Sequence, residues 1–398
     1  MSKLEKLIQQ YCPDGVEWKP LGEVCDSLNK GTLTTSKLVK SNGHNYPVIN
    51  SGRELYGYYS KYNNEGDALT IAARGEYAGF VSYFSERFWA GGLCYPYRAN
   101  TPTVSTKYLY YYLKSKQEYI RHCLVAEGGI PALNKSIIEM FEIPVPPLPV
   151  QEEIVRILDT FTELQAELQA ELQAELQKRL QQYNYYRDNI LSVYSDSNTV
   201  RILDLQQCVS PDCSMSYGVV QPGEDFIGGI PVVRPVDLSG RIIHNKGIKT
   251  VKPILLKAYS RTELKGGELL VCVRGTTGVV AFAGEDLKGG NVTRGIVPLR
   301  FNPLVNSNYM YHLFNSRFVK KQIENKTQGA ALQQINVGDL KKISIPIPPL
   351  EEQNRIVAIL DRFDTLTNDL TSGLPAEMEK RRQQYEYYRD RLLTFKRL

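Results

Sequence analysis

Apolar side chains recur every three or four residues over a long stretch in the middle of the chain. Between residues 151 and 193 no Pro or Gly interrupts this spacing, and mostly Glu, Gln and Arg occupy the other positions. The pattern predicts one amphipathic helix of roughly 40 residues, about 60 Å long at about 1.5 Å per residue. Its apolar positions include Ile154, Ile157, Leu158, Phe161, Leu164, Leu168, Leu172, Leu176, Leu180 and Tyr183.

The same pattern returns 202 residues later in the chain. Residues 143–193 and 345–395 align without a gap and are identical at 27 of 51 positions. Each copy opens with a proline box, at 143–148 and 345–350, and closes with Gln-Gln-Tyr-x-Tyr-Tyr-Arg-Asp, at 181–188 and 383–390. Because proline removes a backbone donor and disfavours helix in the preceding residue, we expect an extended lead-in and a helix that starts near Gln151.

A leucine ladder runs through the first copy, where Glu-Leu-Gln-Ala repeats in steps of four. One such ladder alone is typical of a dimerising coiled coil. Two matched copies in one chain favour an intramolecular antiparallel pair instead, with Gly373 and Pro375 breaking or kinking the second helix midway. We expect packing between these helices at Leu164, Leu168, Leu172, Leu176, Leu366, Leu370, Leu374 and Met378.

Short strand patterns fill the stretches between the helical copies. β-Branched and aromatic runs bounded by Gly, Asn and Ser predict strands at 46–49, 68–73, 79–84 and 93–97, followed by a helix at 107–125. Residues 200–342 repeat this plan, with strands at 230–233, 268–273, 279–283 and 295–301 and a helix at 307–325. Arg74-Gly75 and Arg274-Gly275 follow predicted strands at matching places, which supports a diverged duplication.

These elements predict an α+β protein with an internal pseudo-two-fold repeat, in which two globular α/β domains are separated by a pair of long antiparallel helices. The helices are closely repeated while the globular parts have diverged, which indicates a constant frame that carries variable readers. The predicted parts are an N-terminal helical segment (1–15) adjoining the C-terminal helix, a first globular domain (16–142), a central helical spacer (143–199), a second globular domain (200–342) and a C-terminal helical spacer (343–398).

The composition, 42% hydrophobic and 23% charged, is that of a soluble globular protein, and 398 residues suit two or three domains. No run of 18 apolar residues predicts a membrane span, and the charged first ten residues do not form a secretory signal, so we expect a cytoplasmic protein. The seven cysteines form no C-x-x-C pair and the four histidines are scattered. Neither a zinc site nor a disulfide framework is therefore indicated.

The charge is unevenly distributed along the chain. Residues 16–142 carry a net +2 and residues 200–342 a net +8, whereas residues 143–199 carry a net −5. This distribution favours attraction of nucleic acid to the globular domains and its repulsion by the central helix. The alternative is that mildly basic domains are simply soluble.

Motifs of catalysis are not evident in the sequence. We find no P-loop, no G-x-G-x-x-G and no Asn/Asp-Pro-Pro-aromatic tetrapeptide of an amino-methyltransferase. A nuclease signature can be assembled from Pro211-Asp212 and Glu263-Leu264-Lys265, but such pairs arise often by accident. We expect no catalytic residue and no metal site, and a nuclease that uses an undescribed motif stays a third interpretation.

The proline box, the Gln…Ile-Val-x-Ile-Leu-Asp-x-Phe helix start and the Gln-Gln-Tyr-x-Tyr-Tyr-Arg-Asp helix end, each present twice, resemble the specificity subunit of type I restriction-modification enzymes. The resemblance covers essentially the whole chain. It implies a double-stranded DNA-recognition subunit without an active site, whose two target-recognition domains each read half of a bipartite site while the helices set a gap of about six or seven base pairs.

The resemblance also implies the partners of this chain. Two modification subunits would use S-adenosylmethionine to methylate adenine N6, and two optional restriction subunits would use ATP and Mg²⁺. This chain itself would bind no cofactor. The alternative, from another functional class, is a stand-alone DNA-binding regulator or scaffold with a coiled-coil spacer, which would need no such partners.

Base edges are read by loop residues with hydrogen-bonding side chains. The DNA-binding candidates are Lys30, Thr34, Thr35, Lys37, Asn50, Ser51, Arg53, Arg74 and Tyr77 in the first domain, and Arg234, Arg274, Thr276, Thr277, Asn291, Thr293 and Arg294 in the second. For each of them a solvated loop residue is the alternative. Candidates for docking a partner are Tyr183, Tyr186, Tyr385 and Tyr388, for which packing between the helices is the alternative.

Overall fold

The computed structural model describes residues 2–43, 45–195, 200–329, 333–368 and 373–398. The chain divides into two compact units, each with its own hydrophobic core. The first unit comprises Met1–Ala170 and Glu379–Leu398, and the second comprises Glu171–Met378. The long helix α6 (Leu148–Ser195) therefore begins in the first unit and ends in the second.

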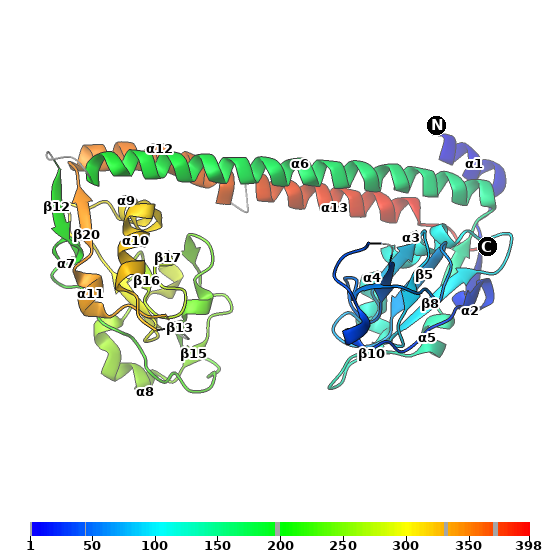
Figure 1. Ribbon diagram of the computed structural model, residues 1–398, viewed down its shortest axis with the longest axis horizontal. Helices are drawn as coiled ribbons and strands as arrows, with labels where there is room; N and C mark the ends of the chain where they lie inside the picture. Colours follow the sequence, from blue (N-terminus) through cyan, green and yellow to red (C-terminus); the bar gives the residue numbers. More distant parts are fainter. Residues whose placement is uncertain (1, 44, 196–199, 330–332, 369–372) are drawn as a thin grey trace. The chain divides into compact units, whose positions relative to one another are not determined.

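The first unit, in which Figure 1 labels strands β5 and β8, is built on a four-stranded sheet of order β2-β8-β5-β6 and a three-stranded sheet of order β4-β3-β7. All pairs are antiparallel except β3 with β7. Two further antiparallel pairs, β1-β11 and β9-β10, complete it. The strands are β1 (Glu17–Pro20), β2 (Cys25–Ser27), β3 (Tyr46–Ile49), β4 (Gly57–Tyr59), β5 (Ala68–Ala72), β6 (Val81–Phe84), β7 (Trp89–Ala90), β8 (Cys94–Ala99), β9 (Val125–Ala126), β10 (Ala132–Leu133) and β11 (Glu142–Val145).

The second unit repeats this plan with one difference: its strand β14 pairs in parallel with β17, at the edge of the sheet opposite to the one where β2 pairs with β8 in the first unit. A four-stranded sheet of order β14-β17-β16-β19 accompanies a three-stranded sheet of order β15-β13-β18, and β12 pairs with β20 as β1 pairs with β11. The strands are β12 (Arg201–Asp204), β13 (Ile230–Val233), β14 (Ile242–Ile243), β15 (Thr250–Val251), β16 (Leu269–Cys272), β17 (Val280–Ala283), β18 (Asn291–Val292), β19 (Ile296–Leu299) and β20 (Ser344–Ile347). The predicted α+β fold with an internal repeat is thereby confirmed.

The helices of the first unit, besides the start of α6, are α1 (Lys3–Tyr11), α2 (Leu21–Val24), α3 (Thr106–Ser115), α4 (Gln117–Tyr119) and α5 (Lys135–Glu139). Those of the second are α7 (Leu205–Cys208), α8 (Pro253–Leu256), α9 (Ser307–Asn315), α10 (Arg317–Lys326), α11 (Val337–Lys341) and α12 (Leu350–Asn368), and α13 (Leu374–Leu392) enters the first unit at Glu379. The single helices expected at 107–125 and 307–325 are each interrupted, at Lys116 and at Ser316. The Ser316 hydroxyl caps α10 by accepting a hydrogen bond from Val319 N, so the interruption starts a new helix.

Both proline boxes form edge strands rather than helix, as expected, because proline cannot donate to a ladder. The first long helix starts at Leu148, three residues before the predicted Gln151, because Pro149 lies in its first turn, where a missing N–H costs nothing. The predicted break in the second copy is confirmed. α12 ends at Asn368 and α13 begins at Leu374, with Pro375 in its first turn.

A buried glutamine fixes the start of α6 to the first unit. Gln151 is inaccessible to solvent, and its Nε2 donates to the carbonyl oxygens of Thr103 at 2.8 Å and Pro146 at 2.6 Å. Its Oε1 accepts a hydrogen bond from Ser105 N at 2.9 Å. One buried side chain thus satisfies three backbone groups at the junction between the proline box and the loop before α3, and the bond to Pro146 O is fully buried.

Gln353 makes the same three contacts at the start of α12. Its Nε2 donates to Leu304 O at 3.0 Å and Pro348 O at 2.9 Å, and its Oε1 accepts from Asn306 N at 2.8 Å. A buried tyrosine supports each junction. Tyr108 Oη donates to Pro144 O at 3.0 Å, and Tyr309 Oη donates to Pro346 O at 2.9 Å. The repeated helix motif is therefore a repeated attachment of helix to globular unit.

The far end of each repeat packs against the other unit's helix start. Tyr183, near the end of α6, is buried in the second unit, where its hydroxyl lies 2.9 Å from His312 Nδ1 and its ring stacks on Phe363. Tyr385, near the end of α13, lies in the first unit with its hydroxyl 3.0 Å from Thr162 Oγ1. For Tyr183 the structure thus favours packing over docking of a partner.

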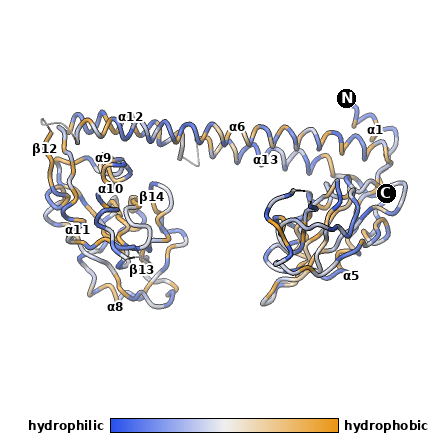
Figure 2. Tube along the Cα trace, in the orientation of Figure 1, coloured by the Kyte–Doolittle hydropathy of each residue, from blue (hydrophilic) through white to orange (hydrophobic). Residues whose placement is uncertain are grey.

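The leucine ladder is only partly covered. Hydrophobic and hydrophilic residues alternate around α6 (Figure 2), and Leu168, Leu172 and Leu176 are half-buried, as are Leu374 and Met378. Contrary to expectation, Leu164 and Leu366 are 56% and 50% exposed. A four-residue step exceeds the 3.6-residue turn, so successive leucines rotate by about 40° and cannot all face one neighbour. Leu370 lies outside the described residues.

No helix among the residues that the structure describes is both long enough and apolar enough to cross a membrane.

Loss of one buried glutamine should weaken folding markedly. Gln151→Ala is expected to lower the free energy of unfolding by about 2–4 kcal/mol, because a buried carbonyl and two partly buried backbone groups lose their only side-chain partner. Urea unfolding followed by circular dichroism measures this. Gln182→Ala, on an exposed face of the same helix, is the matched control and should change stability by less than about 0.5 kcal/mol. Equal effects of the two changes would contradict the attachment role.

Candidate nucleic-acid interface

Each unit presents an arginine at the end of a buried central strand. β5 leads through buried Ala73 to exposed Arg74, and β16 leads through Val273, 1% exposed, to half-exposed Arg274. The glycines that follow, Gly75 and Gly275, have φ values of 90° and 87°, a region that side chains with a Cβ rarely adopt. This turn ends the strand and projects the arginine outward.

A second segment holds each arginine in place through its backbone. In the first unit Gly75 N donates to Pro131 O at 2.9 Å and Leu133 N donates to Ala73 O at 2.8 Å. In the second unit Gly275 N donates to Gln333 O at 2.8 Å and Ile335 N donates to Val273 O at 3.0 Å. The backbone around each arginine therefore has the same hydrogen-bonding pattern, although the loops around the two arginines differ in sequence.

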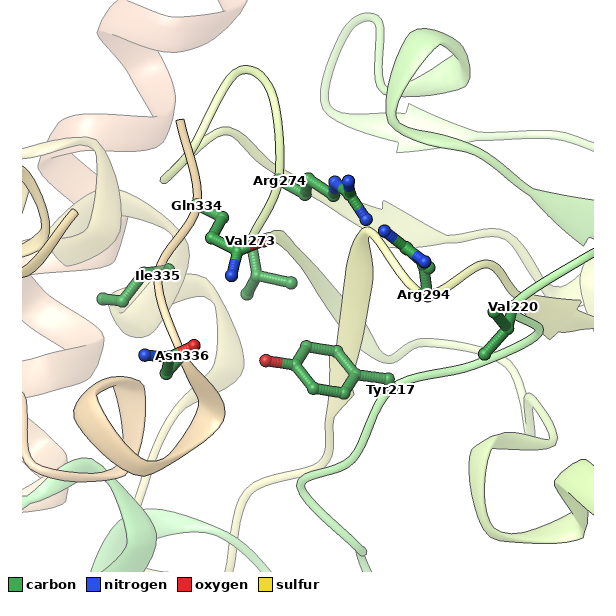
Figure 3. Close-up of a pocket in the computed structure, with 8 residues that line it drawn as sticks. All are labelled: Tyr217, Val220, Val273, Arg274, Arg294, Gln334, Ile335 and Asn336. Carbon is green, nitrogen blue, oxygen red and sulfur yellow. The ribbon is translucent and has the colours of Figure 1, made fainter. Parts of the chain in front are cut away.

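In the second unit Arg274 lies in an open pocket of about 380 Å³. Figure 3 shows the guanidinium groups of Arg274 and Arg294 pointing toward one another, with Tyr217, Gln334 and Asn336 on the other side of the pocket. No acidic side chain is among its lining residues, and within the described part of the chain neither guanidinium group has an ion-pair or hydrogen-bond partner. Two facing cations without a counter-charge favour a ligand that offers acceptor atoms, such as guanine O6 and N7 or a phosphate.

In the first unit Lys30 lies over the ring of Tyr95 of β8. Lys30 Nζ lies 5.1 Å from the centre of the Tyr95 ring, and Tyr95 Oη donates to Leu133 O at 3.0 Å. Burial raises the pKa of Tyr95, and the charge of Arg74 acts in the opposite direction. The first unit therefore presents a cation over an aromatic ring and an exposed arginine at the end of β5, groups suited to phosphates and bases.

Other candidates of the first unit divide into accessible and occupied groups. Thr34, Thr35, Lys37 and Arg53 are exposed, and Tyr77 is 39% exposed. Ser51 Oγ shares a hydrogen bond of 3.0 Å with Tyr56 Oη. Asn50 Oδ1 accepts a hydrogen bond of 2.8 Å from Leu93 N, so this side chain supports the turn before β8.

Asn291 and Thr293 are corrections to the sequence-based candidates, because both side chains are buried, 1% and 8% exposed. Asn291 Oδ1 accepts from Thr262 Oγ1 at 2.8 Å and its Nδ2 donates to Tyr259 O at 2.9 Å, so it joins β18 to the preceding loop. Neither side chain can reach a base edge. The polar sequence suggests an exposed loop, but Asn291 is buried against the segment that contains Tyr259 and Thr262.

Arg234 is also a correction, since its guanidinium is already paired. Nε and Nη2 donate to the Asp237 carboxylate at 3.0 and 2.8 Å. Thr276 is exposed, and Thr277 is half-buried with its hydroxyl 3.4 Å from Thr327 Oγ1. The pocket residues Tyr217, Gln334 and Asn336 were not predicted. Each lies about 60 residues from Arg274 in the sequence, and no local pattern of the sequence indicates that the fold brings them beside it.

The site offers recognition groups rather than catalytic ones. Burial raises the pKa of the Cys272 thiol beside Arg274, so this thiol stays protonated and is a poor nucleophile. Among the described residues no three His, Cys, Asp or Glu side chains lie close enough together to hold a metal ion.

The tyrosines at the helix ends occupy three kinds of place. Tyr183 is buried, and Tyr385 is half-buried. Tyr186 stacks on Phe363 and Tyr388 meets Phe161 edge-on, yet these two tyrosines stay 41% and 44% exposed. Tyr186 and Tyr388 thus keep an accessible face for a partner.

Comparison with known proteins assigns a family. A family model described as the type I restriction modification DNA specificity domain matches residues 13–178 and 224–380. A Haemophilus influenzae protein assigned as a type I restriction enzyme specificity subunit is 33% identical over 98% of each chain. The specificity subunit of the Escherichia coli enzyme EcoR124I/EcoR124II is 31% identical over 99% of this chain and 97% of its own. A solved chain of a type I R-M system, 17% identical, shares the fold with a TM-score of 0.64 over 96% of this chain and 98% of its own.

Replacement of either arginine should relax sequence choice in one half of the bound DNA site only. Arg274→Ala is expected to cost about 1–3 kcal/mol for the preferred base at one position, because a bidentate base contact is lost. Arg74→Ala should act on the other half. Selection from randomised duplexes measures both, with Lys288→Ala, an exposed cation outside the pocket, as control. Uniform weakening on all sequences would instead identify a phosphate contact.

Proposed function

The chain belongs to the type I restriction-modification DNA specificity family, and we propose that each of its two units reads one half of a bipartite site in double-stranded DNA. It is the specificity subunit of such a system, and DNA sequence recognition within a multi-subunit complex is its function. The comparisons favour this function over a stand-alone regulator or scaffold. Because its ligand is DNA, we also propose that it acts in the cytoplasm.

One observation carries the proposal of two half-sites: an arginine with the same backbone surroundings ends a central strand in each unit. Arg74 and Arg274 end equivalent strands, are followed by glycines of the same conformation and are bonded to equivalent segments. A protein with two such readers in an internal two-fold repeat matches the two-fold character of duplex DNA. The loops around the arginines differ, so the two half-sites are expected to differ in sequence.

The charges support contact with phosphates as well. Residues 200–342 carry a net +8, and Arg274 and Arg294 have no acidic partner within the described residues. Lysine and arginine side chains release counterions from the duplex when they contact it. The central stretch 143–199, with a net charge of −5, is expected to stay away from the backbone.

Chemistry on the DNA belongs, in this proposal, to partner subunits. Two modification subunits would bind S-adenosylmethionine and methylate adenine N6, and optional restriction subunits would use ATP and Mg²⁺. The half-exposed faces of Tyr186 and Tyr388, which lie on equivalent positions of the two repeats, are candidate contacts for two identical partners. This chain would decide where on the DNA the partners act.

The direct experiment is co-expression with a modification subunit, followed by mapping of methylated adenines across the host genome. A stoichiometric complex that methylates adenine in one bipartite sequence is the expected result. DNA binding by the chain alone, without any complex or methylation, would favour a stand-alone DNA-binding regulator.

Salt should weaken DNA binding steeply. The logarithm of the binding constant is expected to fall linearly with the logarithm of salt concentration, with a slope of about −0.9 for each phosphate neutralised. Fluorescence anisotropy with a labelled duplex between low and physiological salt measures the slope. A slope near zero would contradict phosphate contacts and with them the DNA-binding role.

Shortening α6 should shorten the unread gap. Deletion of residues 167–170 removes one ladder unit, about 6 Å of helix with a net rotation of only about 40°. We expect both half-sites to stay the same and the gap to lose about one base pair, which methylation mapping of the variant complex shows. Gln169→Ala, which leaves the helix length unchanged, is the control. An unchanged gap after the deletion would refute the spacing role, and altered half-sites would show that helix and readers are not independent.

A further inference from the structure

Gln334 is the cross-strand neighbour of Arg274. Because side chains along paired extended segments point alternately inward and outward, the direction of the Gln334 side chain follows from its neighbours. Val273 and Ile335 are both 1% exposed and point into the core, so the residues beside them, Arg274 and Gln334, point outward. Arg274 and Gln334 form an antiparallel bridge. Side chains directly opposite in such a pair share a face, with Cβ atoms about 4.5–5.5 Å apart. Arg274 and Gln334 therefore start from adjacent points on one face, and their terminal groups reach different parts of the same pocket (Figure 3).

The backbone of Gln334 is held from both sides. Gly275 N to Gln333 O and Ile335 N to Val273 O flank its bridge with Arg274. On the other side Gln334 exchanges two hydrogen bonds of 2.9 Å with Gln328. Gln334 therefore lies in the middle of three paired segments, while its exposed side chain makes no hydrogen bond to any described residue. A fixed backbone with an unengaged amide is what a base-reading residue requires.

The two side chains have complementary chemistry. Arginine offers parallel donors that fit guanine O6 and N7, whereas glutamine offers one donor and one acceptor that fit adenine N7 and N6. We propose that Gln334 is a specificity-determining residue that reads an adenine adjacent to the base contacted by Arg274. This inference rests on the proposed function of the chain as a reader of a bipartite DNA site.

In the first unit the residue opposite the arginine is different. Arg74 bridges Ala132 in the same way, flanked by the equivalent hydrogen bonds from Gly75 N and Leu133 N. Alanine has no donor or acceptor in its side chain, and its methyl group suits contact with a thymine methyl or no base at all. The arginine is thus shared by both units, and its cross-strand neighbour is the position at which their base choice differs.

The experiment uses the full-length chain in complex with its modification subunits. Sequences selected from a randomised duplex pool by the parent are compared with those selected by Gln334→Ala. Gln333→Ala, the same side chain one residue earlier on the opposite face, is the matched control. The parent and the control should require an adenine at one position that Gln334→Ala reads about 10-fold to 100-fold less selectively, with the rest of the site unchanged.

A second measurement changes the DNA and compares its binding by the parent with its binding by Gln334→Ala. 7-Deazaadenine at the required position lacks the N7 atom that accepts a hydrogen bond, so it should weaken binding by the parent but leave binding by Gln334→Ala unchanged. Equal loss with both proteins, or an unchanged motif for Gln334→Ala, would overturn the role of Gln334 while the proposed function stands. Absence of any sequence-selective binding by the parent would overturn both.

The converse change tests the same idea in the first unit. Ala132→Gln should introduce a preference for adenine at one position in the other half-site, while the half read by the second unit is unaffected. A variant that binds the parental site with no altered preference at any position would count against the cross-strand neighbour as a specificity position.

Discussion

The structure depends on one interaction that occurs twice, the burial of a glutamine amide where a proline box turns into a long helix. Prolines at these junctions leave carbonyl oxygens without neighbouring N–H groups, and Gln151 and Gln353 satisfy them together with a backbone N–H of the adjacent loop. An unsatisfied buried polar group costs about 1–3 kcal/mol, so these junctions tolerate little change. The loops that carry Arg74 and Arg274 do not contribute to them. Recognition can therefore vary without disturbing the attachment of the helices.

Much of this organisation could be predicted because the repeated motifs combine strong local signals. Helical periodicity without Pro or Gly located α6, proline boxes located edge strands, and Gly373 with Pro375 located the break between α12 and α13. The arginines followed from a strand pattern ending in Arg-Gly. Each of these signals depends on neighbours in sequence, which is why a sequence reveals them.

The sequence-based candidates were wrong where contacts with residues elsewhere in the fold determine whether a side chain is accessible. Asn291 is polar and follows two glycines, yet Thr262 and Tyr259 enclose it. Arg234 resembles a free loop cation, but Asp237 curls back to pair with it. Gln334 has no local signal in the sequence, because its importance comes from lying opposite Arg274, 60 residues away, across a bridge that no local pattern encodes. Side-chain accessibility in loops is a tertiary property, and polarity alone predicts it poorly.

The crossed placement of the helix-end tyrosines has a consequence for the origin of the chain. Tyr183 leaves the first repeat to pack beside His312 in the second unit, and Tyr385 leaves the second repeat to pack beside Thr162 in the first. In a single repeat on its own, the tyrosine at the helix end would have no site to pack into, and the packing site near the helix start would lack its tyrosine. Two identical copies could each supply the tyrosine that packs into the other. Such a homodimer would read a palindrome. Gene duplication and fusion would have released the two halves from that symmetry, so that each could evolve toward an unrelated sequence.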